Sequence, residues 1–72
     1  MSYEQITKIN RVRIVYRRGV RIAEGAESKV YRVSTRHYPS GEKYVLLVWS
    51  ADLGRCVWVR EDDVEVVSVA EA

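Results

Sequence analysis

Cysteine, histidine and proline each occur only once among the 72 residues of this chain, and phenylalanine is absent. A lone cysteine excludes an internal disulfide, and one cysteine with one histidine falls short of the roughly three or four ligands typical of zinc. The longest apolar run, Tyr44 to Trp49, is much shorter than the roughly 18 residues that a membrane-spanning helix needs. The N-terminus also lacks the basic and apolar regions of a secretory signal. We therefore expect a cytoplasmic protein without bound metal or membrane segment.

The sequence offers little catalytic chemistry, because Cys56 and His37 are its only thiol and imidazole. Both lie in segments that we expect to form strands, where a thiol usually packs as an apolar group and a histidine forms hydrogen bonds. The chain contains no glycine-rich phosphate-binding motif and no H-E-x-x-H motif, and residues 61–63 lack the spaced oxygen ligands of a calcium loop. We predict a protein with no catalytic residue, no cofactor and no small-molecule substrate.

A chain of 72 residues is long enough for one domain but buries only about 60% of its unfolded surface. A core of this size leaves a domain marginally stable, so contacts between copies would help to stabilise it. We expect residues 11–69 to form a single domain, residues 1–10 a partly ordered arm and residues 70–72 a tail. Self-association into a homodimer remains open at this point.

Thirteen valines, together with isoleucine, tyrosine and tryptophan, favour strands over helices, because β-branched and aromatic side chains suit an extended backbone. Polar and apolar residues alternate over several segments, which predicts strands with one face toward solvent. Residues 44–49 are apolar on both faces and predict the most central strand. We expect strands at residues 11–16, 20–22, 29–37, 44–49, 56–60 and 64–69.

Turn-forming residues separate these segments. Gly19 ends a predicted hairpin turn at residues 17–19, and Pro39-Ser40-Gly41 predicts a tight reversal, because proline fixes φ and glycine accepts a positive φ. Residues 50–55 predict another reversal, and residues 61–63 one helical turn. Five or six short strands with a helical turn before the last suit a small twisted barrel with few exposed edges. We therefore predict an all-β fold of the SH3-like barrel type.

A second line of reasoning supports the same fold. Four short motifs follow one another between Tyr31 and Val67: Tyr31-x-Val33, Arg36-His37, Ser40-Gly41-Glu42 and Trp58-Val59-Arg60. In this segment the chain resembles small uncharacterised bacterial domains with an SH3-like look. The resemblance implies the fold alone, because that family carries no established activity to transfer.

Basic side chains are concentrated in the first half of the chain, where residues 1–38 carry nine basic and three acidic side chains. Residues 39–72 carry three basic and seven acidic ones. Arginine outnumbers lysine nine to three, and guanidinium groups both pair with phosphate and stack on bases. If the early strands are neighbours, seven arginines share one outward face: Arg11, Arg13, Arg17, Arg18, Arg21, Arg32 and Arg36.

This arginine-rich face predicts a non-enzymatic binding module whose partner is nucleic acid, or alternatively an acidic protein surface. Tyr16, Tyr31, Tyr38 and Trp58 offer stacking platforms, as in small barrels that hold single strands, although the alternation places Tyr31 toward the core. Trp58 lies outward beside Arg60, either as an interface anchor or as a cover over the open end of the barrel. The alternative function is protein–protein interaction, including a mobile-element accessory protein or inhibitor that docks on a host complex through Trp58 and the charged face.

Overall fold

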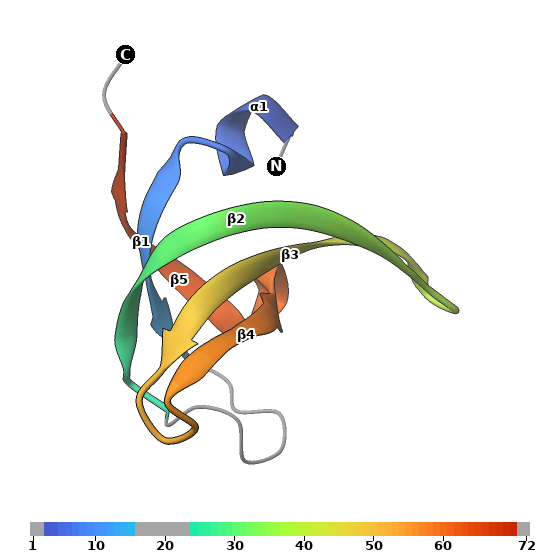
Figure 1. Cartoon of the computed structure of the whole chain (residues 1–72). Coiled ribbons are helices and arrows are strands. Elements are labelled where there is room, and N and C mark those ends of the chain that lie inside the picture. The colour runs from blue at the N-terminus through green and yellow to red at the C-terminus, as the bar shows by residue number, and fades with distance from the viewer. Residues whose placement is uncertain (1–2, 16–23, 71–72) are drawn as a thin grey trace.

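The computed structural model describes residues 3–15 and 24–70, and within them five antiparallel strands form one sheet (Figure 1). The strand order is β4-β3-β2-β1-β5. A short helix precedes the first strand, and a 3-10 turn separates the last two strands. The element bounds are α1 Tyr3–Ile6, β1 Ile9–Ile14, β2 Glu27–Tyr38, β3 Gly41–Ser50, β4 Arg55–Arg60, η1 Glu61–Asp63 and β5 Val64–Val69.

The all-β prediction is confirmed, as is the helical turn before the last strand. The strands predicted at residues 29–37, 44–49, 56–60 and 64–69 match β2 to β5 within three residues at either end. The edge strands β4 and β5 are not paired with each other, so the sheet is not closed and the predicted barrel is not confirmed. The turn expected at residues 17–19 and the strand expected at residues 20–22 lie outside the described residues.

The core lies between the arch of β2, β3 and β4 and the strands β1 and β5 that cross beneath it (Figure 1). Each fully buried aliphatic side chain contributes about 1.5–3 kcal/mol to folding, so a small set of such residues carries most of the stability. Ile6 of α1 belongs to this set, which means that the segment before β1 packs onto the sheet. The buried residues of the core cluster are Ile6, Ile9, Val12, Ile14, Leu46, Val48 and Val57.

The longest hairpin joins β2 and β3, and its turn end projects away from the rest of the molecule (Figure 1). Tyr38 pairs with Gly41 across a two-residue turn formed by Pro39 and Ser40. Gly41 has a φ of 122°, a value that residues with a Cβ rarely adopt. The tight reversal predicted from proline and glycine is therefore confirmed.

An irregularity in β2 changes which side chains face the core. Val30 pairs with Val48 while Arg32 pairs with Leu47, so β2 carries one extra residue at this point, as in a β-bulge. Val30 and Val33 consequently both pack against the core, whereas Tyr31 is 49% exposed. The prediction that Tyr31 faces the core is therefore wrong, because the bulge reverses the alternation.

The position of β3 also differs from the prediction. The middle strand of the sheet is β2, with β3 lying between β2 and β4. Successive residues Val45 and Leu46 are nonetheless both buried, so β3 is covered on both faces near its middle. The apolar run thus predicted burial on two faces correctly but not the strand order, because a covered strand need not be the middle one.

Candidate functional site

The predicted arginine face divides into two groups along β2. Arg11 and Arg13 lie on β1, in register with Lys29 and Glu27 at the start of β2. Arg36 lies near the opposite end of β2, and nine residues of strand span up to about 30 Å. Arg32 lies between these two groups on β2, and Arg17, Arg18 and Arg21 lie outside the described residues.

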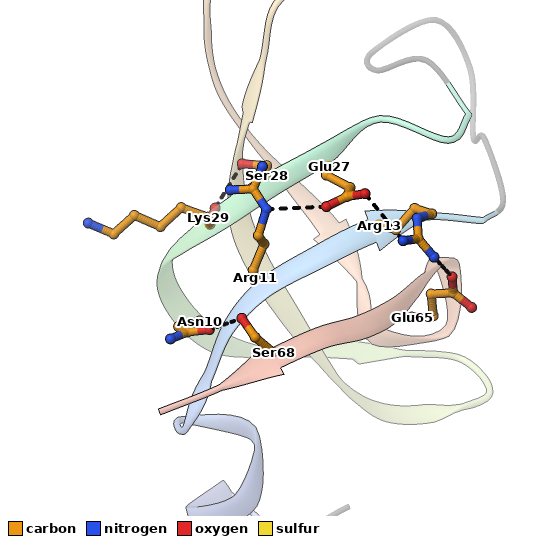
Figure 2. A network of polar contacts seen from close by, with 8 residues as sticks. All are labelled: Asn10, Arg11, Arg13, Glu27, Ser28, Lys29, Glu65 and Ser68. Atoms are coloured by element: carbon orange, nitrogen blue, oxygen red, sulfur yellow. Dashed lines mark hydrogen bonds and ion pairs between the residues drawn. The ribbon is translucent and has the colours of Figure 1, made fainter. Parts of the chain in front are cut away.

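The first group is matched by carboxylates, as Figure 2 shows. Arg11 Nε donates to Glu27 Oε1 at 3.3 Å, and Arg13 Nη2 donates to Glu27 Oε2 at 3.2 Å. Arg13 Nη1 also donates to Glu65 of β5. We call Arg11, Arg13, Glu27 and Glu65 the acid-paired cluster, in which two positive charges face two negative ones.

The protonation behaviour of this cluster reflects the pairing. Hydrogen bonds from Arg11 and then Arg13 lower the pKa of Glu27 below its ordinary value of 4.5. Hydrogen bonds to Glu65 and then Glu27 raise the pKa of Arg13. The pairing therefore favours the charged forms of Glu27 and Arg13. Because two arginines face two glutamates, the cluster offers little unbalanced charge to a polyanion.

The second group combines arginine with aromatic rings. The guanidinium of Arg60 lies 4.0 Å from the ring centroid of Tyr38, and that of Arg36 lies 6.0 Å from the ring centroid of Trp58. Both distances are within the range of cation–π contacts. We call Arg36, Tyr38, Trp58 and Arg60 the stacked face.

Strand register explains why these four side chains meet. Arg36 and Tyr38 are two residues apart on β2, and Trp58 and Arg60 are two residues apart on β4, so each pair shares one face of its strand. The register of the strands directs all four side chains away from the core. Each contact runs diagonally across β3, which separates the two strands. Trp58 pairs with Leu47, and Arg60 pairs with Val45.

Val45 shows that the stacked face is closely packed. This residue points away from the core and does not belong to the core cluster, yet it is only 2% exposed. Its register partners are Ser34 on β2 and Arg60 on β4, and the long side chains of Arg36 and Trp58 lie at the diagonal positions. The stacked side chains cover Val45, and their apolar parts pack against it.

The electrostatics of the stacked face differ from those of the acid-paired cluster. Lys43, which pairs with Arg36 in the register, forms an ion pair with Asp62 at 3.0 Å. In the described part of the chain, Arg32, Arg36 and Arg60 form no ion pair with a carboxylate. Arg32 and Arg36 are also exposed to solvent. Among the described residues, no carboxylate thus pairs directly with these three arginines, in contrast to Arg11 and Arg13.

Cys56 and His37 do not form a nucleophile–base pair. Cys56 pairs with Trp49 at one end of β3, whereas His37 pairs with Glu42 at the other. His37 Nδ1 lies 3.4 Å from a Glu42 carboxylate oxygen. Among residues 3–15 and 24–70, no three side chains of His, Cys, Asp or Glu gather into a group that could hold a metal ion.

The contacts of Glu27 and Tyr38 were not predictable from the sequence. Glu27 precedes the strand expected at residues 29–37, but it is the first residue of β2 and faces the β1 arginines. Tyr38 was named as a stacking platform, but its pairing with Arg60 depends on the register of three strands. The two-residue spacing of Arg36 with Tyr38 and of Trp58 with Arg60 was visible in the sequence. The register that places the first pair beside the second was not.

No helix within the described ranges is both long and apolar enough to cross a membrane. Comparisons of the chain with protein-family models, curated proteins and solved structures found no match.

Proposed function

We propose that this protein is a non-enzymatic module that binds single-stranded nucleic acid through the stacked face. The observation that carries the proposal is the placement of two guanidinium groups, those of Arg36 and Arg60, over aromatic rings without a carboxylate partner among the described residues. The same chain neutralises Arg11 and Arg13 with glutamates. The contrast identifies the stacked face as the surface with charge left for a ligand.

A guanidinium that lies over a ring is suited to nucleic acid in two ways. Its edge N–H groups remain directed outward and pair with phosphate oxygens, while its open face stacks on a base. Holding the group against Tyr38 or Trp58 also reduces the rotamer entropy lost on binding. Aromatic rings beside cations are the usual surface for unpaired bases, which expose their π-faces when the duplex is absent.

We also propose an SH3-like arrangement for the domain. The order β4-β3-β2-β1-β5, with β2 long enough to pair with both β1 and β3, supports it. The 3-10 turn directly before the last strand supports it as well. In this arrangement the stacked face lies on the outer side of β2, β3 and β4, opposite the core.

Salt-dependent binding tests the proposal. We expect a labelled single-stranded oligodeoxythymidylate of about ten nucleotides to bind, with an affinity that falls steeply as salt rises. The double variant Arg36→Ala/Arg60→Ala should lower the slope of log K against log salt by about 1.4, because each lost phosphate contact on a single strand removes about 0.7. Fluorescence anisotropy over a series of salt concentrations measures both quantities.

The matched control is the double variant Arg11→Ala/Arg13→Ala, which removes the same formal charge from the acid-paired cluster. We expect this variant to retain the wild-type salt slope, because its arginines are already engaged by Glu27 and Glu65. Equal loss of slope in both variants would show that net charge alone drives binding. Absent or salt-insensitive binding of the wild type would contradict the proposal.

A protein partner is the second candidate function, and the edge strand β5 favours it. Val66, Val67 and Val69 of β5 are 43%, 39% and 54% exposed, and one edge of this strand has no neighbour in the sheet. Exposed apolar edges are common sites of strand addition by another chain or a second copy. A nuclease-resistant partner in a pull-down that is lost with Val67→Lys but retained with Arg36→Ala would support this function over the first.

A further inference from the structure

A pocket of about 240 Å³ opens beside the bulge of β2. Its apolar wall comprises Ile9 of β1 with Val30 and Val33 of β2. Tyr3 of α1 and Tyr31 of β2 also line the pocket, and both tyrosines are largely exposed, by 58% and 49% respectively. The pocket thus combines an apolar wall with two accessible aromatic rings.

The bulge accounts for the pocket. An extra residue in β2 turns Tyr31 outward while Val30 and Val33 both remain against the core. α1 then lies over this part of the sheet, because Ile6 anchors it in the core, and Tyr3 and Thr7 complete the lining. Bulges commonly occur beside functional sites, where they redirect a side chain out of the regular alternation.

Besides the hydroxyl-bearing residues Tyr3, Thr7 and Tyr31, the pocket has one charged lining residue, and that residue is basic. Arg32 lines it, and the Nζ of Lys29 lies 5.4 Å from the ring centroid of Tyr31. The hydroxyl of Thr7 donates to the carbonyl oxygen of Glu4 at 2.9 Å, so its oxygen is oriented to accept a hydrogen bond. The site therefore presents two aromatic rings, the oriented hydroxyl oxygen of Thr7 and the cation of Arg32, with the cation of Lys29 beside Tyr31. No carboxylate lines it among the described residues.

We propose that this pocket binds a single unstacked nucleobase of the strand that the stacked face holds, an inference that rests on the proposed function. Its volume is below the roughly 300–1,000 Å³ of sites that enclose drug-sized ligands, and it suits one planar ring system. Tyr31 and Tyr3 stack on the base, the Thr7 oxygen accepts from a ring N–H, and Arg32 and Lys29 pair with the flanking phosphates.

Continuity with the stacked face supports this assignment over an isolated ligand. Arg32 and Arg36 lie on the same outward side of β2. They are four residues apart, which corresponds to about 13 Å of strand. A polynucleotide backbone that follows this side passes from Trp58 and Arg36 to Arg32 and then reaches the pocket. The complementary charge of phosphate is what selects a nucleic acid rather than a neutral aromatic ligand.

The test compares two single-stranded oligomers with the same phosphates, oligodeoxythymidylate of about ten nucleotides and an analogue in which every nucleotide lacks its base. Each is titrated into the wild-type protein and into Tyr31→Ala, with Leu53→Ala as the control. Leu53 is 42% exposed in the turn between β3 and β4, so this control removes exposed apolar surface outside the pocket.

We expect Tyr31→Ala to weaken binding of oligodeoxythymidylate about tenfold, as one lost stacking contact predicts, and to leave binding of the base-free oligomer and the salt slope unchanged. Leu53→Ala should leave all affinities unchanged. Equal weakening of both oligomers by Tyr31→Ala would overturn the base pocket. Equal binding of both oligomers by the wild-type protein, with a steep salt slope, would also overturn it. In either case the proposed binding of single-stranded nucleic acid would stand.

Absence of binding to either oligomer would instead refute the proposed function and the pocket assignment together. In that case a nuclease-resistant partner that is captured by the wild type and lost with Tyr31→Ala would assign the pocket to an aromatic side chain of a protein. Far-ultraviolet circular dichroism of each variant verifies the fold, and Tyr31 is exposed enough for its removal to leave the core intact.

Discussion

Arginine residues of identical chemistry have different roles in this protein because of their neighbours. Arg13 is held between Glu27 and Glu65, whereas Arg36 and Arg60 contact aromatic rings. The first arrangement satisfies the charge within the molecule, and the second leaves it available to a ligand. Counting arginines in a segment therefore overestimates a binding surface unless the carboxylates of neighbouring strands are placed as well.

Glu27 makes the residue-scale contribution to pH dependence. Its pKa is lowered in the folded state by hydrogen bonds from Arg11 and Arg13, so its stabilising effect is present above the unfolded pKa and is lost as pH falls through the folded value. We expect the thermal midpoint to decrease as pH falls below the ordinary glutamate pKa of 4.5, and Glu27→Gln to show a smaller decrease. Circular dichroism melts at stepwise pH values measure this difference.

The control for that experiment is Asp52→Asn, which removes an exposed carboxylate in the turn between β3 and β4. This variant should keep the wild-type pH dependence. A Glu27→Gln protein with an unchanged pH profile would show that the acid-paired cluster does not contribute to stability, as is common for exposed ion pairs.

At the scale of the element, the bulge in β2 is the feature with the widest consequences. It brings Val30 and Val33 to the core, turns Tyr31 outward and opens the pocket beside α1. The irregular pairing is accompanied by a compensating contact, because the backbone N–H of Trp49 donates to the Ser28 hydroxyl at 2.8 Å. Ser28 in turn donates to the carbonyl oxygen of Lys29 at 2.8 Å.

Ser28→Ala should destabilise the fold by about 1–2 kcal/mol, since it leaves the Trp49 N–H without its acceptor beside a buried position. Ser28 is 5% exposed, so water replaces the hydroxyl poorly. Urea denaturation followed by circular dichroism gives the free energy of unfolding. Ser34→Ala, an exposed serine of the same strand, is the matched control, and an equal loss in both variants would argue against a specific role for Ser28.

At the scale of the whole molecule, the number of buried side chains limits stability. Among residues 3–15 and 24–70, seven make up the buried core cluster, and the folded state of a domain of this size is only marginally stable. The surface carries the proposed function on the outer side of β2, β3 and β4, while the inner side of the same strands supplies the core. The proposed stacked face thus lies opposite the core, whereas the pocket beside the bulge shares Ile9, Val30 and Val33 with the core side.

Leu46→Ala should remove about 2–5 kcal/mol, because Leu46 is fully buried in the middle of β3. A loss of that size approaches the whole stability of a small domain, so we expect a partly or fully unfolded protein at 25 °C. Far-ultraviolet circular dichroism and amide hydrogen exchange report the change. Leu53→Ala, on an exposed turn, should leave both unchanged, and a folded Leu46→Ala protein would indicate a larger core or an oligomer.

Much of the fold was predictable because local patterns act over short distances. The excess of valine and the alternation of polar and apolar residues predicted strands that match β2 to β5, and Pro39 with Gly41 predicted the turn between two of them. The predicted orientation of Tyr31 was wrong, because a bulge depends on pairing with β3 and not on any local pattern. The acid-paired cluster was missed for the same reason, since Glu65 lies 52 residues from Arg13.

The amino-acid sequence by itself determined the class of the fold, the position of most strands and turns, and the outward direction of Arg36, Trp58 and Arg60. Those features follow from backbone preferences and from the two-residue period of a strand, which are local properties. Only the tertiary structure decided which arginines meet carboxylates, which meet aromatic rings, and where a pocket opens. These outcomes depend on strand order and register, which are determined by the packing of the entire chain.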